Sequence, residues 1–175
     1  MNGKYYTPYF CEENIWKYGQ CIKEELFCRY DVLFLSNQAN TIALLNQKAA
    51  PQGEFIVYDY HVILHCTADL KIFDFDSRLG FETDSEYYFD ETFTDQSLIL
   101  PAFRTAVRVI PLENYIKFFD SDRTHMIMNE QPLQPFPEWP EIRSEGPLSL
   151  ANLLDFGFET FIDRTVTAEE YISSF

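Results

Sequence analysis

Apolar residues near the start of the chain repeat with the spacing of an α-helix. The repeat runs through Ile15, Tyr18, Ile22 and Leu26. It begins beside Cys11, and Glu12 and Glu13 follow where a helix start favours negative charge. The pattern therefore predicts a helix that carries Cys11 in its first turn, on or beside the buried face.

Several later segments have the composition and alternation of β-strands. They are residues 31–36, 41–45, 55–64, 70–75 and 103–110. The segment 55–64 follows Pro51-Gln52-Gly53 and is rich in β-branched and aromatic residues, so we expect a central strand there. In the segment 103–110, alternation places Val107 and Val109 on one face.

Helical patterns return in the second half of the chain. Residues 112–119 and 149–154 predict two short helices, and Thr167 with Glu170 forms a capping box for a last helical turn. One helix, then mostly strands, then short helices indicate an α+β fold rather than a doubly wound sheet. No repeat or charge block divides the sequence, so we expect a single catalytic domain over residues 1–175.

Two polar stretches predict irregular structure. Residues 131–147 contain several prolines together with Phe136 and Trp139, so we expect a loop that wraps on the body of the protein. Residues 82–95 are rich in carboxylates but lack the glycine and regular spacing of an EF-hand loop. We therefore expect a solvated loop there.

The composition narrows the function classes. With 46% hydrophobic and 17% aromatic residues, the 175-residue chain folds around a core. The net charge of −15 argues against a nucleic-acid partner, because no basic stripe neutralises phosphates. No apolar run has the length of a signal peptide or membrane helix. We expect a soluble cytoplasmic protein, with the nucleus as a second location, and no membrane partner.

One cysteine has a setting suited to chemistry. The cysteines are Cys11, Cys21, Cys28 and Cys66, which a reducing compartment keeps as thiols. Their irregular spacing predicts no zinc site, and we expect no other metal or cofactor. A free cysteine is usually a small buried hydrophobe. At a helix start, however, unpaired N–H groups lower a thiol pKa towards roughly 3.5–7.5 and can bind an oxyanion, so Cys11 is the candidate nucleophile.

A thiol nucleophile needs a base, and His61 is the first candidate. It lies in the middle of the predicted strand 55–64, and the next predicted strand carries Asp74 and Asp76 on one face. If the strands are antiparallel neighbours, one of these carboxylates reaches His61, because a buried Asp needs a partner. Cysteine at a helix start, histidine on a strand and aspartate on the next strand are typical of the transglutaminase-like branch of papain-like enzymes.

The other histidines are His65 and His125. His65 shares a strand face with His61, and we expect it to be a core residue whose ring is satisfied by a backbone carbonyl. His125 follows Asp122 by three residues and precedes the Pro-rich stretch. It is the second choice as a base, and its default interpretation is a hydrogen-bond cluster that orders a loop.

These segments together resemble the protein N-terminal glutamine amidohydrolase family. Residues 11–17 resemble its nucleophile segment, residues 59–62 its histidine strand, and residues 73–76 its aspartate strand, with Asp74 in the catalytic position. Residues 34–37, 103–104, 108–109 and 121–126 also resemble family segments in the same order. One departure is Tyr58, which stands where the family has Trp and implies a slightly altered pocket.

The resemblance implies a papain-like or transglutaminase-like cysteine hydrolase with an antiparallel sheet and a nucleophile-bearing N-terminal helix. It also implies a monomer that deamidates the N-terminal Gln of proteins or peptides to Glu, releasing ammonia and feeding the N-degron pathway. Cys11, His61 and Asp74 would form the triad. An imidazolium–thiolate pair of His61 and Cys11 would attack the carboxamide and leave a γ-glutamyl thioester, which water then hydrolyses.

Other functions share parts of this pattern. A cysteine peptidase or a transglutaminase-like acyltransferase would use the same triad and a thioester, so the residues alone do not separate them. A non-enzymatic acidic binding module with a structural Cys11 is the third class.

Overall fold

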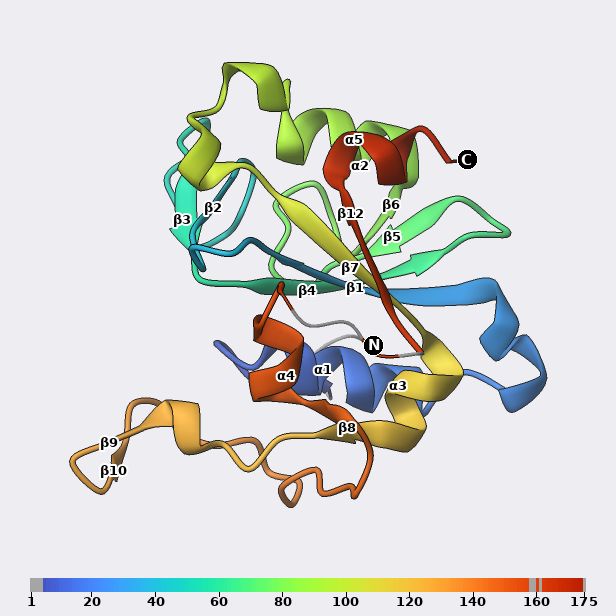
Figure 1. Ribbon diagram of the computed structural model, residues 1–175, viewed down its shortest axis with the longest axis vertical. Helices are drawn as coiled ribbons and strands as arrows, with labels where there is room; N and C mark the ends of the chain where they lie inside the picture. The colour runs from blue at the N-terminus through green and yellow to red at the C-terminus, as the bar shows by residue number, and fades with distance from the viewer. Residues whose placement is uncertain (1–4, 158–159, 161, 175) are drawn as a thin grey trace.

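A six-stranded sheet forms the centre of the protein. The computed structural model describes residues 5–157, 160 and 162–174. The strand order is β12-β7-β1-β4-β5-β6, and all neighbours run antiparallel (Figure 1). The strands are β1 Tyr30–Ser36, β4 His61–Cys66, β5 Lys71–Phe73, β6 Glu82–Asp84, β7 Ala106–Pro111 and β12 Arg164–Thr167. The protein is therefore a mixed α and β fold with a large antiparallel sheet, as the sequence predicts.

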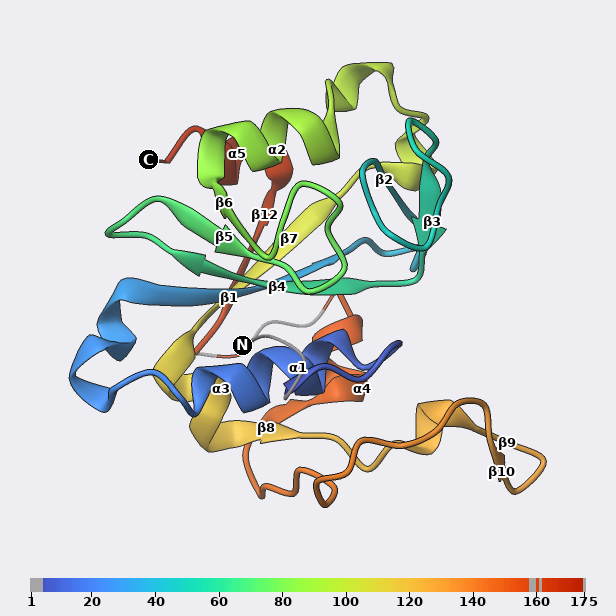
Figure 2. The same cartoon turned by 180° about the vertical axis from the view of Figure 1, so that it is seen from behind.

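Helices cover both faces of this sheet (Figures 1 and 2). On one face lie α1 Cys11–Gly19, α3 Leu112–Phe118 and α4 Leu150–Leu154. On the other face lie α2 Ser85–Phe93 and α5 Ala168–Ile172. No helix in the described part of the chain is long and apolar enough to cross a membrane.

Alternate residues of β1 enter the two cores on either side of the sheet. Val32 and Phe34 belong to the core beneath α1 and α3, whereas Leu33 and Leu35 belong to the core beneath α2 and α5. All of them are fully buried. Burying such a side chain stabilises the fold by roughly 1.5–3 kcal/mol, which explains why this strand is apolar at consecutive positions.

The remaining elements are short. They are β2 Ile42–Leu44 with β3 Ile56–Tyr58, β8 Phe119–Asp120 with β11 Leu148–Ser149, β9 Ile127–Met128 with β10 Gln131–Pro132, and 3₁₀ helices at Glu24–Arg29, Gln96–Leu98, Pro101–Phe103 and Thr124–Met126. The prediction of a Pro-rich loop on the body holds in part, because Trp139 packs its indole N–H against a carboxylate of α1. The β9–β10 hairpin projects away from the sheet (Figure 1).

The predicted central strand 55–64 is wrong in one respect, because it consists of two strands in different sheets. β3 pairs with β2, and β4 pairs with β1. The break falls at Asp59, whose side chain accepts a hydrogen bond from the Tyr60 N–H (2.9 Å) and whose carbonyl accepts one from the Ser36 hydroxyl (2.5 Å). His61 therefore begins β4 instead of lying in the middle of a strand.

The predicted solvated loop 82–95 is also wrong. It forms β6 and then α2, with Asp84 as the N-cap that accepts a hydrogen bond from the Tyr87 N–H. Tyr88, Phe89 and Phe93 are buried in the core beneath this helix. The carboxylates form the solvent face of this helix. A segment rich in acidic residues can therefore still be a helix when its few apolar residues lie on one side.

The other predicted elements are recovered with changed ends. The first helix ends at Gly19, where an added Cβ would lie 2.8 Å from Leu112, and a separate 3₁₀ helix follows. The predicted strand 103–110 begins only at Ala106. Helices α3 and α4 and the capping box of Thr167 at the start of α5 are confirmed.

Candidate active site

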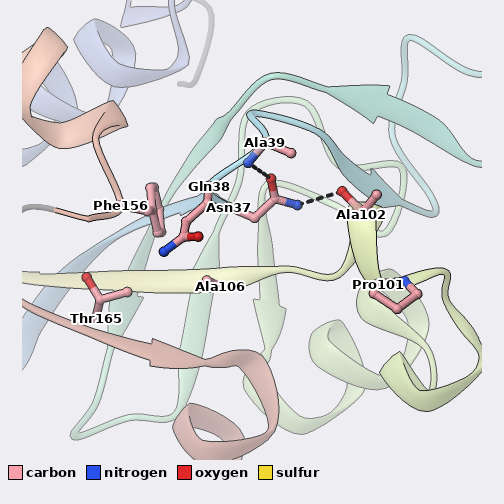
Figure 3. Close-up of a pocket in the computed structure, with 8 residues that line it drawn as sticks. All are labelled: Asn37, Gln38, Ala39, Pro101, Ala102, Ala106, Phe156 and Thr165. Atoms are coloured by element: carbon pink, nitrogen blue, oxygen red, sulfur yellow. Dashed lines mark hydrogen bonds between the residues drawn. The ribbon is translucent and has the colours of Figure 1, made fainter.

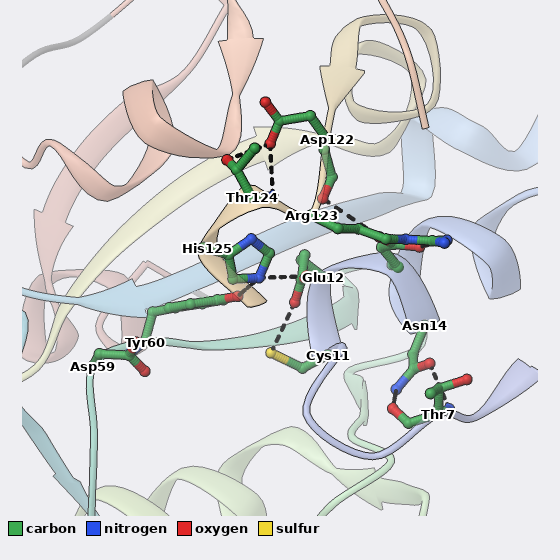
Figure 4. Close-up of polar contacts among 12 residues, drawn as sticks. Thr7, Cys11, Glu12, Asn14, Asp59, Tyr60, Asp122, Arg123, Thr124 and His125 are labelled. Carbon is green, nitrogen blue, oxygen red and sulfur yellow. Dashed lines mark hydrogen bonds and ion pairs between the residues drawn. The ribbon is translucent and has the colours of Figure 1, made fainter. Parts of the chain in front are cut away.

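Asn14 holds the chain in place immediately before the candidate nucleophile. Its side-chain amide donates a hydrogen bond to the Thr7 carbonyl (2.9 Å) and accepts one from the Thr7 N–H (2.8 Å) (Figure 4). Between them, Tyr9 adopts a left-handed backbone conformation (φ 69°), which is unfavourable for a non-glycine residue. The fully buried Asn14 thus stabilises a tight entry that places Cys11 at the first position of α1.

Cys11 is a half-buried residue, and its thiol lies next to a carboxylate. Its Sγ is 3.6 Å from Oε2 of Glu12, and the Val62 backbone also reaches the sulfur. Removal from water raises the pKa of the Cys11 thiol, and the charges of Glu12 and Asp76 raise it further. Burial and the neighbouring carboxylates thus act against the lowering of the pKa that the helix start predicts.

His61 and Asp74 form a buried pair at one end of β4. Nε2 of His61 is 2.9 Å from Oδ1 of Asp74, and both side chains are almost fully removed from water. Burial lowers the pKa of His61, but the Asp74 carboxylate and their hydrogen bond outweigh it and leave the pKa raised. Nδ1 of His61 has no hydrogen bond to another described residue. The charges of Asp74 and Asp76 act on the Cys11 thiol, so the buried pair lies close enough to Cys11 to influence its pKa.

Asp74 accepts hydrogen bonds from several other groups around the site. Besides His61, it accepts from the Asp76 N–H (2.9 Å), the Gln47 amide (3.2 Å) and the Tyr88 hydroxyl (2.8 Å). Burial would raise the pKa of Asp74, but the pairing with His61 and these donors hold it below its ordinary value. Asp74 is therefore ionised at neutral pH and can orient and charge-stabilise the imidazole.

Tyr58 packs flat against the candidate base. Its ring stacks on that of His61 with centroids 5.5 Å apart and an interplanar angle of 18°. The position that departs from the family motif thus supports the imidazole directly. Asp76, the second carboxylate, accepts a hydrogen bond from the Tyr6 hydroxyl (2.6 Å).

His61, Asp74 and Asp76 are also the one group of described residues whose ligand atoms could hold a metal ion, since these atoms lie within 4.8 Å of one another. The protein's own donors already use the carboxylate oxygens, with Asp74 bound to His61 and Asp76 bound to Tyr6. This arrangement fits a hydrogen-bonded imidazole better than a metal centre.

The other two histidines lie elsewhere. His65 is a buried core residue, as predicted. Its Nδ1 is hydrogen-bonded to the Tyr171 hydroxyl (2.7 Å) and its Nε2 to the Ser85 hydroxyl (3.0 Å). Hydroxyl groups thus bind the ring where a backbone carbonyl was expected. His125 does not pair with Asp122, which accepts both hydrogen bonds of Thr124. Its Nε2 instead approaches Tyr60 and Glu12 (Figure 4).

Sequence reasoning missed Tyr88 and Gln47, which both donate to Asp74. The signal for Tyr88 was present, since Asp84 with the apolar positions of residues 88–93 predicts a capped helix. Gln47 follows β2 and carries no comparable signal. A surface pocket of about 390 Å³ lies apart from this site, and Figure 3 shows its lining of Asn37, Gln38, Ala39, Pro101, Ala102, Ala106, Phe156 and Thr165.

The fold and the site indicate a class of protein. The thiol at the start of α1 and the buried pair of His61 and Asp74 are groups of the kind that hydrolases with a thiol nucleophile use.

Comparisons with known proteins identify the family. The profile of a family described as N-terminal glutamine amidase matches residues 6–175. The protein N-terminal glutamine amidohydrolase of Danio rerio is 36% identical over 158 residues, which are 86% of this chain and 77% of the relative. Its namesake in Caenorhabditis elegans is 35% identical over 94% of this chain and 91% of the relative. The chain belongs to the N-terminal glutamine amidase family.

Proposed function

We propose that this protein hydrolyses the side-chain amide of an N-terminal Gln in proteins or peptides, giving Glu and ammonia. The single observation that carries the proposal is the family match over residues 6–175, made with relatives named protein N-terminal glutamine amidohydrolase. The buried contact between His61 and Asp74 beside the Cys11 helix supports a papain-like mechanism on that substrate. The product would enter the N-degron pathway.

The first step is attack by Cys11 on the carboxamide carbon. Because the pKa of the thiol is raised, His61 removes the proton as the sulfur attacks, using the ring nitrogen that does not contact Asp74. The first N–H groups of a helix have no partner within it, so the Cys11 N–H is positioned to bind the developing oxyanion. Losing one such donor typically slows a reaction by about 10²–10³-fold.

The second step releases ammonia. His61, now protonated, gives its proton to the leaving nitrogen, and the carbon–nitrogen bond breaks to leave a γ-glutamyl thioester on Cys11. Neutral His61 then takes a proton from water, whose oxygen attacks the thioester carbonyl. The carbon–sulfur bond breaks, Glu leaves, and the thiol recovers its proton. Asp74 keeps the imidazole in one tautomer and stabilises its charged form in both steps.

The test compares Gln-starting peptides with controls. We expect wild-type protein to release ammonia from a free N-terminal Gln, with little release from N-terminal Asn, acetylated Gln or internal Gln. Asn is one methylene shorter, and a misplacement of about 1 Å can cost 10²-fold in rate. Transfer of the acyl group to an added amine would identify an acyltransferase, and cleavage of the peptide chain would identify a peptidase.

The nucleophile is tested separately. Cys11→Ser should abolish ammonia release while leaving the thermal midpoint nearly unchanged, because a hydroxyl is far less readily ionised than a thiol. Cys21→Ser is the matched control, since Cys21 is an exposed free thiol just beyond the end of the helix that begins at Cys11. Substantial activity in Cys11→Ser would refute the assignment, and a large drop in its thermal midpoint would indicate a structural role.

A further inference from the structure

Two neighbouring glutamates on α1 are completely buried, and the structure treats them differently. Glu13 accepts hydrogen bonds from Arg123 at both carboxylate oxygens (2.8 and 2.7 Å) and from the Trp139 indole (2.8 Å). Its charge is therefore matched by a guanidinium and its oxygens are occupied. This is how a fold normally stabilises a buried carboxylate.

Glu12 has no guanidinium partner, and only the Tyr60 hydroxyl, its own backbone N–H and the Cys11 thiol act on its carboxylate as donors. Its Oε2 faces the weak thiol donor of Cys11 at 3.6 Å, and its Oε1 is buried without a hydrogen-bond partner among the residues that the structure describes. His125 Nε2 approaches Oε1 only to 3.7 Å. The backbone of Glu12 is fixed, because its carbonyl accepts a hydrogen bond from the Tyr115 hydroxyl (3.0 Å). This oxygen is therefore free to accept a hydrogen bond from a bound ligand.

We propose that the Glu12 carboxylate binds the α-ammonium group of the substrate's first residue. The inference rests on the proposed function, which requires a free amino terminus beside the thiol. An ammonium group brings a positive charge and three donors, which is what Oε1 lacks.

The distances allow one residue to span both groups. In glutamine, the α-nitrogen and the carboxamide carbon are separated by four bonds, or about 5 Å when extended and less when folded. The attacked carbon must approach the sulfur to about 3–3.5 Å. Since Oε2 of Glu12 lies 3.6 Å from Cys11 Sγ, a glutamine bound through its amine to this carboxylate can present its carboxamide to the thiol.

His125 lies where the amine would enter. Its ring lies beside Glu12 (Figure 4), and its side chain is 26% exposed while that of Glu12 is fully buried. Burial lowers the pKa of His125 despite nearby carboxylates, so the neutral ring does not compete as a cation. The Tyr60 hydroxyl lies 3.5 Å from the same ring nitrogen. A shift of the exposed His125 ring would open Oε1 to the substrate.

The electrostatic environment of Glu12 agrees with this role. Burial raises the pKa of the Glu12 carboxyl group to about 8, and the neighbouring charge of Glu13 adds to the effect. An arriving ammonium group would favour the ionised carboxylate, so the ion pair forms only when a substrate of the right chemistry is present.

The experiment measures preference for the amine instead of activity alone. Two peptides are compared, one starting with Gln and one starting with its analogue that lacks the α-amino group. Wild-type kcat/KM should favour the amine by about 10-fold to 10²-fold, the size of a hydrogen bond to a charged group. Glu12→Gln should lose most of this preference. Asp59→Asn is the matched control, because Asp59 is an exposed carboxylate beside Tyr60, and it should keep the preference.

Each alternative has its own outcome. If Glu12→Gln slows both peptides equally, Glu12 acts on the thiol and the inference is wrong. If Asp59→Asn loses the preference instead, the anchor is Asp59. If wild-type protein releases no ammonia from the Gln peptide, the proposed function itself has failed.

A binding measurement tests the proposal even if Glu12→Gln has no catalytic activity. Calorimetry of both peptides on the Cys11→Ser background, with and without Glu12→Gln, removes catalysis from the comparison. The free-amine peptide should bind about 10-fold or more tightly than its analogue only when Glu12 is present. An equal difference in the double variant would overturn the proposal. Thermal midpoints confirm that each variant is folded.

Discussion

The carboxylate of Asp74 meets the imidazole of His61 at 2.9 Å because strand β5 ends early. In the β4–β5 ladder Leu64 lies opposite Phe73, and continuing that register would place Asp76 opposite His61. The chain leaves the ladder after Phe73, and Oδ1 of Asp74 accepts the Asp76 N–H in a tight turn. That turn brings Asp74 to the imidazole, whereas Asp76 accepts a hydrogen bond from the Tyr6 hydroxyl.

The first prediction concerns these two carboxylates. Asp74→Asn should reduce kcat far more than Asp76→Asn, because an amide at position 74 favours the wrong imidazole tautomer and leaves the imidazolium unpaired. A comparable change in a serine triad costs about 10⁴-fold. Steady-state ammonia release from a Gln peptide measures both. Equal losses, or a larger loss in Asp76→Asn, would show that the wrong carboxylate has been assigned.

The second prediction concerns the donor that α2 supplies. Tyr88→Phe removes one hydrogen bond of about 2.8 Å from a buried carboxylate, which should cost about 1–3 kcal/mol of stability. It should also lower kcat by about 10-fold, because Asp74 is held less firmly. Tyr87→Phe is the control, since Tyr87 is 52% exposed on the same helix. If the two variants are indistinguishable in urea denaturation and kinetics, Tyr88 does not support the site.

The third prediction follows from the pKa of Glu12, which burial raises to about 8 from an ordinary value of 4.5. Between these pH values the folded protein keeps a proton that the unfolded chain has lost, so the folded state binds more protons. The contribution of the Glu12 carboxyl group to the free energy of unfolding is therefore highest below about pH 4.5 and declines as the pH rises towards about 8. Gln does not titrate, so Glu12→Gln should gain stability over wild type across this window.

Chemical denaturation at several pH values measures that difference. At about 1.4 kcal/mol per pH unit, the gain should reach a few kcal/mol and then level off above about pH 8. A gain in stability with loss of amine recognition would be the usual conflict between a stable fold and a functional site. A difference between wild type and Glu12→Gln that stays constant with pH would mean that the carboxyl group ionises normally in the folded protein.

The fourth prediction addresses metal. Chelators should leave ammonia release unchanged. Oδ1 of Asp74 is hydrogen-bonded to His61, and Oδ1 of Asp76 accepts a hydrogen bond from the Tyr6 hydroxyl. Added Zn²⁺ should inhibit by displacing these hydrogen bonds, since the ligand atoms of His61, Asp74 and Asp76 lie within 4.8 Å of one another. Inactivation by EDTA that Zn²⁺ or another divalent ion reverses would contradict a metal-free mechanism.

Much of the fold could be read from local patterns. The helix start at Cys11, the capping box at Thr167 and the buried strand β1 follow from side-chain spacing and from hydrogen bonds between near neighbours. The resemblance of residues 11–17, 59–62 and 73–76 to one family also lies in the sequence, and the family match over residues 6–175 confirms it.

Tertiary structure decided the remainder. Whether Asp74 or Asp76 reaches His61 depends on where a strand leaves its ladder, and the raised pKa of Cys11 depends on burial and on carboxylates from other segments. The sequence placed a negative charge at Glu12 but did not indicate that one oxygen would be buried without a donor. These properties arise from desolvation and from contacts between distant residues, which act only after the chain has folded, and local spacing does not encode them.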